Sequence, residues 1–367
     1  MRSVTEPIAI SRVRTDGQVE PLGRWRHEQR TLELDREGFP FLGPGTYALE
    51  GELPWIFWDM CPSGYLGRRL QARLPALALS ANPRDWTASD CLRALTLAGA
   101  DLAGNLLVGE ESVRAFARAS FDPREVGVLL DEVLRDALTT DAPSSLGGER
   151  PKLLGSTADG RGYLMKFSPP PTSPQGVRWS DLLRMEAHCA RTLREGGVSA
   201  VQATAATTRG RTTLHVARFD RLVRRGRVGA ATLFWLAMDR WGDVTLTAPQ
   251  VVSRLHAEGL IDHTAVEVCE LVHAFSAAIG NTDAHLGNYG LIFDDHGAAS
   301  LAPIYDVLPM ALAPRHDELP DEHLAPRGSP PDARVQGWVE RLVRLTEADP
   351  GITHEFKTTW LRHIGLL

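Results

Sequence analysis

Cysteine is scarce in this 367-residue chain, and its four cysteines stand far apart with no C-x-x-C pair: Cys61, Cys91, Cys189 and Cys269. This scatter argues against a zinc site built from cysteines and against a disulfide framework, and it is typical of reduced thiols. Long apolar runs are also missing, so we expect no membrane-spanning helix. The first ten residues lack the apolar core of a secretory signal, and we therefore expect a cytoplasmic protein.

An excess of basic charge is absent too. The formal net charge is -6, which gives the whole chain no electrostatic footprint for nucleic acid, although a local basic patch is not excluded. The sequence contains neither a Walker A loop nor the G-x-G-x-x-G loop of ordinary protein kinases. The length is more than one small core accommodates, and it predicts two or three packed units.

The pattern of apolar residues divides the chain into three predicted units. Residues 1–138 begin with short strands and hairpins and continue, from about residue 89, with helical spacing. Residues 139–222 contain the strands KLLGS and GYLMKF, a helix from about Ser180 to the Gly196-Gly197 pair, and the strand RTTLHVARFDR. Residues 223–367 are mostly helical, with one hairpin rich in Asp and Asn. We predict an α+β fold whose second half is helical.

The most informative segment is G-N-T-D-A-H-L-G-N, which places Asp283 five residues before Asn288; Asp306 follows eighteen residues after Asn288, in P-I-Y-D. Phosphoryl transfer needs a carboxylate to accept the proton of the attacking hydroxyl, and oxygen ligands for magnesium. The spacing assigns Asp283 as base and Asn288 as metal ligand, with Asp306 as the main metal ligand. Asp and Asn are also frequent in turns, and a lone D-x-x-x-x-N would be read that way. His285 organises the loop, contacts phosphate, or is simply structural.

N-T-D-x-H-x-x-N followed by P-x-Y-D resembles the signature of HipA-type serine/threonine kinases. L-P-W at Leu53 and G-Y-L-G-R at Gly64 resemble the YjjJ-type branch of that family, although no N-terminal helix-turn-helix is evident. The resemblance implies a two-lobed, protein-kinase-like fold with a small β-rich N-terminal subdomain and a mostly helical C-terminal lobe.

The resemblance also implies a lysine and a glutamate on the ATP side. Lys166 ends an apolar strand, and Glu186 follows twenty residues later in the predicted helix. Glu195 is a weaker alternative to Glu186. Taken alone, Lys166 also fits an edge lysine and Glu186 an exposed helix position.

The segment S-S-L-G-G-E-R-P-K resembles the family's loop over the ATP phosphates. Glycine allows the backbone to approach the nucleotide, and backbone N–H groups bind anionic oxygens. Ser144, Ser145, Gly147, Gly148 and Lys152 are the candidates there. The resemblance further implies autophosphorylation of Ser144 or Ser145, which would lower ATP affinity.

The segment R-F-D-R resembles the family's hinge, so the backbone of Ala217, Arg218 and Phe219 is expected to meet the adenine edge. Five arginines cluster in and after it: Arg218, Arg221, Arg224, Arg225 and Arg227. Two interpretations stay open for this cluster. It is a solvated turn, or it contacts an acidic partner, phosphate or nucleic acid.

We predict an ATP- and Mg²⁺-dependent serine/threonine protein kinase. Family resemblance implies a bacterial toxin with an antitoxin partner and a substrate such as an aminoacyl-tRNA synthetase or another translation protein. We expect no membrane association and no intrinsic binding to nucleic acid. The rival functions are a kinase of small molecules or lipids, which uses the same core, and a pseudokinase that only binds.

Overall fold

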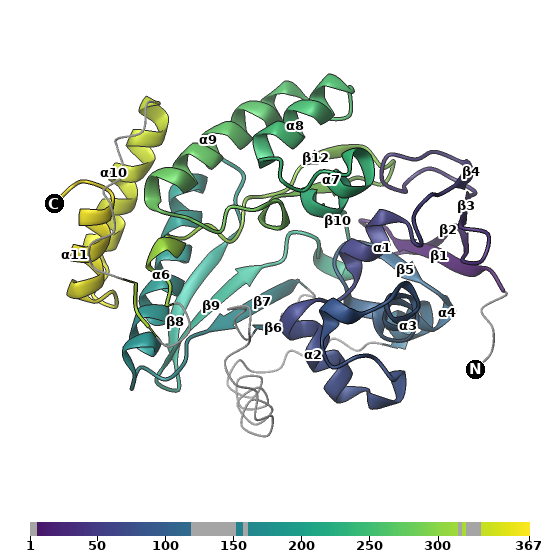
Figure 1. Ribbon diagram of the computed structural model, residues 1–367, viewed down its shortest axis with the longest axis horizontal. Helices are drawn as coiled ribbons and strands as arrows, with labels where there is room; N and C mark the ends of the chain where they lie inside the picture. The colour runs from purple at the N-terminus through teal and green to yellow at the C-terminus, as the bar shows by residue number, and fades with distance from the viewer. Residues whose placement is uncertain (1–5, 119–151, 157–160, 315–317, 321–331) are drawn as a thin grey trace.

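Residues 6–118, 152–156, 161–314, 318–320 and 332–367 are described by the computed structural model (Figure 1). The first of these ranges begins with a five-stranded antiparallel sheet in the order β4-β3-β2-β1-β5. The strands are β1 (Ile8–Val13), β2 (Val19–Arg26), β3 (Thr31–Leu34), β4 (Gly45–Ala48) and β5 (Leu106–Val108). Trp25 and Leu32 are cross-strand partners and are fully buried, so the sheet has one apolar face.

Residues 6–118 also contain four α-helices beside this sheet: α1 (Trp55–Met60), α2 (Gly64–Arg73), α3 (Ala88–Ala98) and α4 (Glu110–Arg118). The helical spacing expected from residue 89 is confirmed for α3, which Thr87 begins with a capping box. It is wrong for Leu106–Val108, which forms β5 against β1. A short, fully buried strand has no alternation, so its apolar run looks like part of a helix.

A second antiparallel sheet has the order β6-β7-β9-β8. Its strands are β6 (Lys152–Ser156), β7 (Gly162–Phe167), β8 (Ala203–Thr208) and β9 (Arg211–Ala217), and α6 (Pro174–Glu195) connects β7 to β8. The expected strands β6, β7 and β9 are confirmed. The helix begins six residues before the predicted Ser180, because Ser173 caps it and Pro174 occupies its first turn.

The remaining elements are mainly helical. They are β10 (Gly229–Thr232), α7 (Leu233–Trp241), α8 (Ala248–Ala257), α9 (His263–Ile279), the 3₁₀ turn η5 (Leu286–Asn288), β11 (Gly290–Phe293), β12 (Ala299–Leu301), α10 (Ala333–Ala348) and α11 (His354–His363). Strands β10, β11 and β12 form a small sheet, with β11 and β12 as the predicted hairpin. Across the described ranges, no helix is both long enough and apolar enough to span a membrane.

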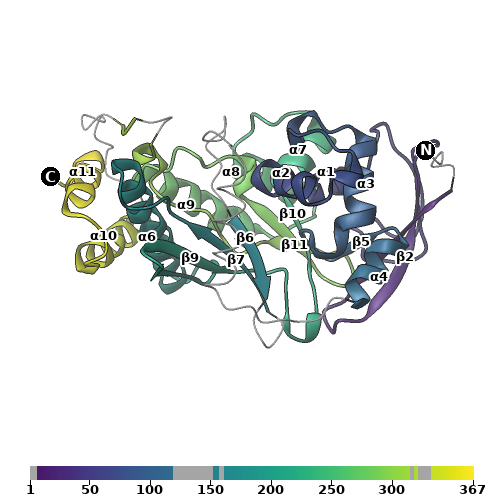
Figure 2. The same cartoon turned by 90° about the horizontal axis from the view of Figure 1, so that it is seen from below.

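The arrangement in space places α6 between the second sheet and the α10–α11 pair, and the N-terminal sheet lies at the opposite end of the molecule (Figures 1 and 2). One apolar core runs from Ile10 in β1 to Trp360 in α11. A smaller core joins Leu183 of α6 to Leu214 and Val216 of β9, and it fixes α6 against the sheet. This smaller core lies between α6, which contains the predicted Glu186, and the sheet that contains the predicted Lys166.

Candidate active site

Lys166 lies near the end of β7, and its ammonium group connects the predicted residues. Its Nζ donates to both carboxylate oxygens of Glu186, at 2.9 and 3.0 Å, and to Oδ1 of Asp306 at 2.6 Å. The lysine side chain is only 15% exposed. Burial opposes its charge, but the carboxylates of Asp306 and Glu186 outweigh burial, and the pKa of Lys166 lies above its usual value. The ammonium group is therefore fixed in place and fully charged.

Glu186 reaches this position because of how α6 packs. Leu183, Ala187 and Ala190 face the second sheet, and Glu186 lies on the same side of the helix. The residue is 3% exposed. Burial raises the pKa of its carboxyl group to about 7, although the neighbouring Lys166 favours the ionised form. The predicted alternative, Glu195, instead pairs at the helix end with Arg191 and Arg341 and is not part of the site.

Asp306 lies on an irregular segment that the backbone holds firmly. Ile304 exchanges backbone hydrogen bonds with Ser199 and Val201, both at 2.9 Å. Asp306 itself has a φ of +57°, a left-handed conformation that Asp adopts more readily than most residues. Burial disfavours its ionised form, but the Lys166 ammonium outweighs burial, and the pKa of Asp306 lies below its usual value. Its side chain is 36% exposed, so the carboxylate remains accessible to a ligand.

The loop from Asn281 to Asn288 folds back on itself. Asn288 Nδ2 donates to the backbone carbonyl of Asp283 at 2.8 Å. Asn281 Oδ1 accepts from the Asp283 N–H at 3.1 Å, and His285 Nδ1 accepts from the Gly287 N–H at 3.0 Å. The carbonyl oxygen of the Asn288 side chain is therefore the atom left for a cation. No role was predicted for Asn281; its buried side chain orders the backbone of Asp283.

Asp283 presents a half-exposed carboxylate, as a proton acceptor for a bound substrate must. His285 Nε2 lies 3.6 Å from its Oδ1. Burial raises the pKa of Asp283, His285 lowers it, and the negative Asp306 raises it. Because Gly287 donates to Nδ1, the proton of a neutral His285 ring lies on Nε2, toward Asp283. This contact favours the prediction that His285 organises the loop.

Tyr305 connects the two halves of the site, and no role was predicted for it. Its hydroxyl donates to the Gly287 carbonyl at 3.1 Å, and its ring lies 5.9 Å from that of Phe219. The sequence signal was its place directly before Asp306 in P-I-Y-D. The hydrogen bond fixes the Asp306 segment relative to the loop that contains Asn288.

The oxygen donors of Asn288 and Asp306 suit magnesium, which prefers oxygen ligands and usually binds through one or two protein groups plus phosphates and waters. No group of three or more acidic, His or Cys residues that could hold a metal occurs in the described ranges. A magnesium ion at Asn288 and Asp306 would take its remaining ligands from phosphates and waters.

The nucleotide side is only partly described. Ser144, Ser145, Gly147 and Gly148 lie outside the described residues. Lys152 is the cross-strand partner of Lys166, and its charge favours ionisation of both Glu186 and Asp306.

At the predicted hinge, two backbone donors already have partners. Ala217 N–H binds the Gln202 carbonyl at 2.8 Å, and Arg218 N–H binds the Gly162 carbonyl at 2.9 Å. Within the described ranges no acceptor binds the Phe219 N–H, which leaves it as the candidate donor to adenine. The predicted contact of this segment with adenine remains a prediction, and it now rests on Phe219.

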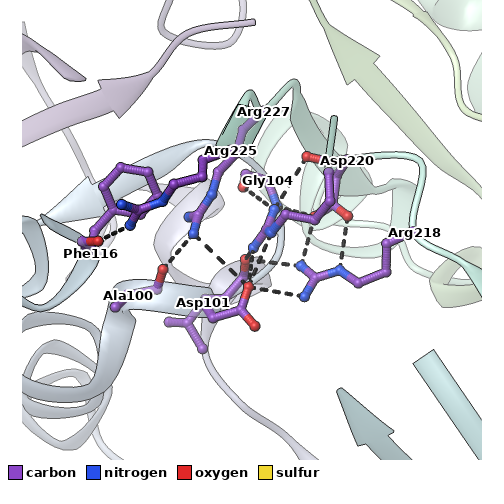
Figure 3. A network of polar contacts seen from close by, with 10 residues as sticks. Ala100, Asp101, Gly104, Phe116, Arg218, Asp220, Arg225 and Arg227 are labelled. Atoms are coloured by element: carbon purple, nitrogen blue, oxygen red, sulfur yellow. Dashed lines mark hydrogen bonds and ion pairs between the residues drawn. The ribbon is translucent and has the colours of Figure 1, made fainter. Parts of the chain in front are cut away.

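Most of the basic cluster after the hinge contacts other residues of the same chain (Figure 3). Arg218 binds both oxygens of Asp220 at 2.9–3.0 Å, and Arg221 binds Asp220 Oδ2 at 2.8 Å. Both arginines also bind Asp101, at 2.8–3.1 Å. Asp220 accepts from the Gly104 N–H at 2.9 Å as well. The acidic partners of these arginines, Asp101 and Asp220, belong to the chain itself.

Two further arginines of the cluster contact Phe116. The guanidinium groups of Arg225 and Arg227 lie 4.1 and 4.7 Å from the centre of its ring, and Arg227 donates to the Ala100 carbonyl at 2.6 Å. Arg224 alone stays exposed, as the solvated-turn interpretation predicts. These contacts with Asp101, Ala100 and Phe116 hold the segment after the hinge against the N-terminal unit.

Two family models match the chain. One is described as "YjjJ-like toxin, middle domain" and matches residues 4–117. The other, described as "HipA-like C-terminal domain", matches residues 144–345. A curated relative, Toxin YjjJ of Escherichia coli (strain K12), is 34% identical over an alignment of 281 positions that covers 71% of this chain and 61% of the relative. The match therefore spans less than two thirds of that relative's length.

A solved structure is similar over nearly the whole chain. It is described as the Shewanella oneidensis MR-1 toxin–antitoxin system HipA, HipB and its operator DNA complex. The TM-score is 0.61 at 15% identity, with 97% of this chain and 96% of that chain covered. This likeness confirms the predicted fold, in which a β-rich N-terminal region precedes a kinase-like domain with a helical C-terminal lobe. The expected lack of nucleic-acid binding gains no support, because the solved complex contains DNA.

Proposed function

Because the chain belongs to the HipA-like family, whose C-terminal domain model covers residues 144–345, we propose that it is an ATP- and Mg²⁺-dependent serine/threonine protein kinase. The observation that carries this proposal is the position of Lys166, bound at once to Glu186 and to Asp306. A lysine–glutamate pair beside an acidic metal ligand is the arrangement that phosphoryl transfer in protein kinases requires.

Each residue has a definite part in the proposed reaction. Lys166, held by Glu186, places a fixed positive charge for the phosphates of ATP. Asn288 and Asp306 would hold Mg²⁺, which when bound neutralises charge on those phosphates. Asp283 accepts the proton of the attacking hydroxyl. The oxygen of that hydroxyl forms the new bond to the γ-phosphorus, the bond to the β-phosphate oxygen breaks, and ADP leaves.

His285 and Asn288 support Asp283 in this step. The contact from His285 Nε2 favours the ionised carboxylate, which is the form that takes up a proton. Asn288 and Asn281 hold the Asp283 backbone from both sides. These contacts favour an active kinase over a pseudokinase, because a binding module has no need of an ordered base.

The biological role is part of the proposal. The toxin and toxin–antitoxin relatives support a bacterial toxin with an antitoxin partner. We further propose a cytoplasmic enzyme whose target is a protein of translation, such as an aminoacyl-tRNA synthetase, and whose loop serine, Ser144 or Ser145, is autophosphorylated. An interaction with operator DNA through the antitoxin would be compatible with a net charge of -6.

The experiment is incubation of the purified chain with Mg-ATP and a bacterial lysate, followed by phosphoproteomics, with Asp283→Asn as the control. The expected result is phosphoserine or phosphothreonine on a small set of proteins in the wild-type sample alone. Phosphorylation of lipids or metabolites with unmodified proteins would contradict the assignment to protein substrates. The absence of ATP turnover would contradict the kinase itself.

A further inference from the structure

Helix α6 makes polar contacts on two opposed faces. Glu186 points toward Lys166 and the nucleotide side. An α-helix turns roughly 100° per residue, so the angle between two side chains around the axis follows from their spacing. By this rule four residues of α6 lie on the side opposite Glu186: Asp181, Arg184, His188 and Glu195. Each of them pairs with the C-terminal helical pair, which we define as α10, α11 and their connection 349–353.

The pairing of Asp181 with Thr353 is the most buried of these contacts. Asp181 Oδ1 accepts from the Thr353 backbone N–H at 2.9 Å, and Oδ2 accepts from its hydroxyl at 2.7 Å. Asp181 is 1% exposed. A carboxylate buried to this degree is tolerated only when its oxygens have partners, so the geometry of this contact is strongly specified.

Further contacts follow the same face toward the C-terminal end of α6. His188 Nε2 lies 2.9 Å from Asp349 Oδ2, and Arg184 lies 3.7 Å from the other oxygen of Asp349. Arg341 of α10 donates to Glu195 at 2.6 Å. The C-terminal helical pair thus contacts α6 from Asp181 to Glu195. Along the helix axis, Glu186 lies within this stretch, although its side chain is on the opposite face.

The same helical pair also reaches the base of the catalytic loop. Trp360 of α11 is fully buried, and its indole N–H donates to the backbone carbonyl of Ile279 at 3.2 Å. Ile279 is the last residue of α9, four residues before Asp283. Gly280 has a φ of +86°, and a Cβ on it would lie 2.7 Å from the ring of His363. Trp360 and His363 therefore pack where the backbone turns from α9 into the loop.

We propose that the C-terminal helical pair sets the relative position of the two catalytic arms, with Asp181 and Trp360 as positioning residues. One arm is α6 with Glu186, and the other is the loop with Asp283. The inference rests on the proposed kinase function for its activity readout. It assigns a role to residues 333–363, where the sequence contains no recognisable motif.

The two contacts are expected to act on different kinetic constants. Trp360 holds the loop that contains the base, so its loss displaces Asp283 relative to the acceptor hydroxyl. Displacements of about 1 Å lower rates by up to about 100-fold, and we expect kcat to fall on the order of tenfold with the KM for ATP unchanged. Asp181 holds the helix that fixes Lys166, so its loss is expected to raise the KM for ATP.

The test uses matched substitutions in the intact chain. Trp360→Phe keeps an aromatic ring and removes the N–H donor; its control is Trp86→Phe, because Trp86 likewise donates to a backbone carbonyl, that of Ser80, at 2.8 Å. Asp181→Asn is compared with Asp90→Asn, because Asp90 also accepts from the N–H and hydroxyl of a threonine, Thr87, at 2.9 and 2.8 Å. Both controls lie in the N-terminal unit.

Kinetics are measured well below the Tm of every variant, and hydrogen exchange of residues 281–288 is measured in parallel. The expected result is a lower kcat and faster exchange in Trp360→Phe than in Trp86→Phe, at similar losses of Tm. Equal kcat in both folded variants overturns the proposal. If the wild-type chain transfers no phosphate, the proposed function fails instead, and equal exchange in both variants then overturns the positioning role.

Discussion

Asn288 donates its side-chain amide to the backbone carbonyl of Asp283 at 2.8 Å, which closes the loop between the proposed base and the proposed metal ligand. The two residues whose spacing identified the site are therefore also in direct contact. The contact determines which atom of Asn288 can bind a cation, because its nitrogen is used within the loop. An aspartate at position 288 would supply a metal ligand but no donor for this hydrogen bond.

Replacement of the base is expected to abolish transfer without abolishing binding. Asp283→Asn removes the proton acceptor and keeps the shape, and general-base catalysis contributes about 10²- to 10⁴-fold. We expect phosphoryl transfer to fall by that factor while ATP affinity changes little. Single-turnover kinetics and calorimetry measure the two quantities. Unchanged transfer in the variant would remove Asp283 from the mechanism.

Removal of the metal ligand is expected to act on binding itself. Asp306→Ala removes the carboxylate that would hold the cation, and it leaves Lys166 with Glu186 as its acidic partner. We expect weaker ATP binding in magnesium and a smaller difference between magnesium and EDTA than in the wild type. Calorimetry under both conditions measures this. Equal affinities in wild type and variant would show that Asp306 is only a turn residue.

The pH dependence of ATP use is expected to report on Glu186. Burial raises the pKa of this carboxyl group to about 7, and its ionised form is the one that holds Lys166. As pH falls through about 7, Glu186 takes up a proton, and kcat/KM for ATP should decrease. The profile of Glu186→Gln should lack this inflection while keeping any that belongs to the nucleotide. If the pH profiles of wild type and Glu186→Gln had the same shape, the inflection near pH 7 would not belong to Glu186.

The buried contacts of Asp220 are expected to stabilise the fold. Burial opposes its charge, but Arg218 and Arg221 outweigh burial and hold the pKa of Asp220 well below its usual value. Such a group stabilises the protein above the usual carboxyl pKa, and this contribution is lost as pH falls into the acid range. Asp220→Ala leaves both arginines without this partner and should cost about 3–5 kcal/mol.

The measurement for Asp220→Ala is urea unfolding at pH 7 and at pH 3. The difference between wild type and variant should shrink at the lower pH. Arg114→Gln, which breaks an exposed pair with Glu110 and Glu111, should leave the midpoint almost unchanged. A stability loss for Asp220→Ala no larger than for this control would contradict the role of Asp220.

Autophosphorylation is expected at Ser144 or Ser145. A phosphoserine adds about -1.5 to -2 charges at neutral pH and would repel the ATP phosphates or pair with a nearby cation such as Lys152. We expect phosphate on one serine after incubation with Mg-ATP, and weaker nucleotide binding afterwards. Mass spectrometry and calorimetry test both parts, with the double Ser→Ala variant as control. Undiminished binding by the phosphorylated chain would exclude an inhibitory switch.

The sequence predicted the parts of the site whose signals are local. Lys166 ends an apolar strand, Glu186 lies on a helix with clear apolar periodicity, and Asp283 with Asn288 falls in one nine-residue segment. The structure brings these residues together with Asp306 through the packing of α6 on the second sheet. Strands β6, β7 and β9 were equally clear, because alternation and turn residues are short-range properties.

What the sequence did not predict depends on contacts between distant segments. Arg218 and Asp101 are 117 residues apart, and no local pattern shows that they meet. The charge of the arginine cluster suggested an external partner because charge alone does not identify the acceptor. The contact of Trp360 with Ile279 was equally hidden, since its acceptor is a backbone carbonyl that every residue possesses.

The left-handed backbone of Asp306 restricts which amino acids can evolve at this position. Glutamate offers the same carboxylate, but a left-handed φ of +57° costs most side chains about 1–2 kcal/mol. Glycine and asparagine accept the backbone and lack the charge. The position requires both a carboxylate and a left-handed backbone conformation. Aspartate meets both requirements with the least backbone strain. Substitution at this position is therefore expected to remove the proposed metal ligand before it affects the fold.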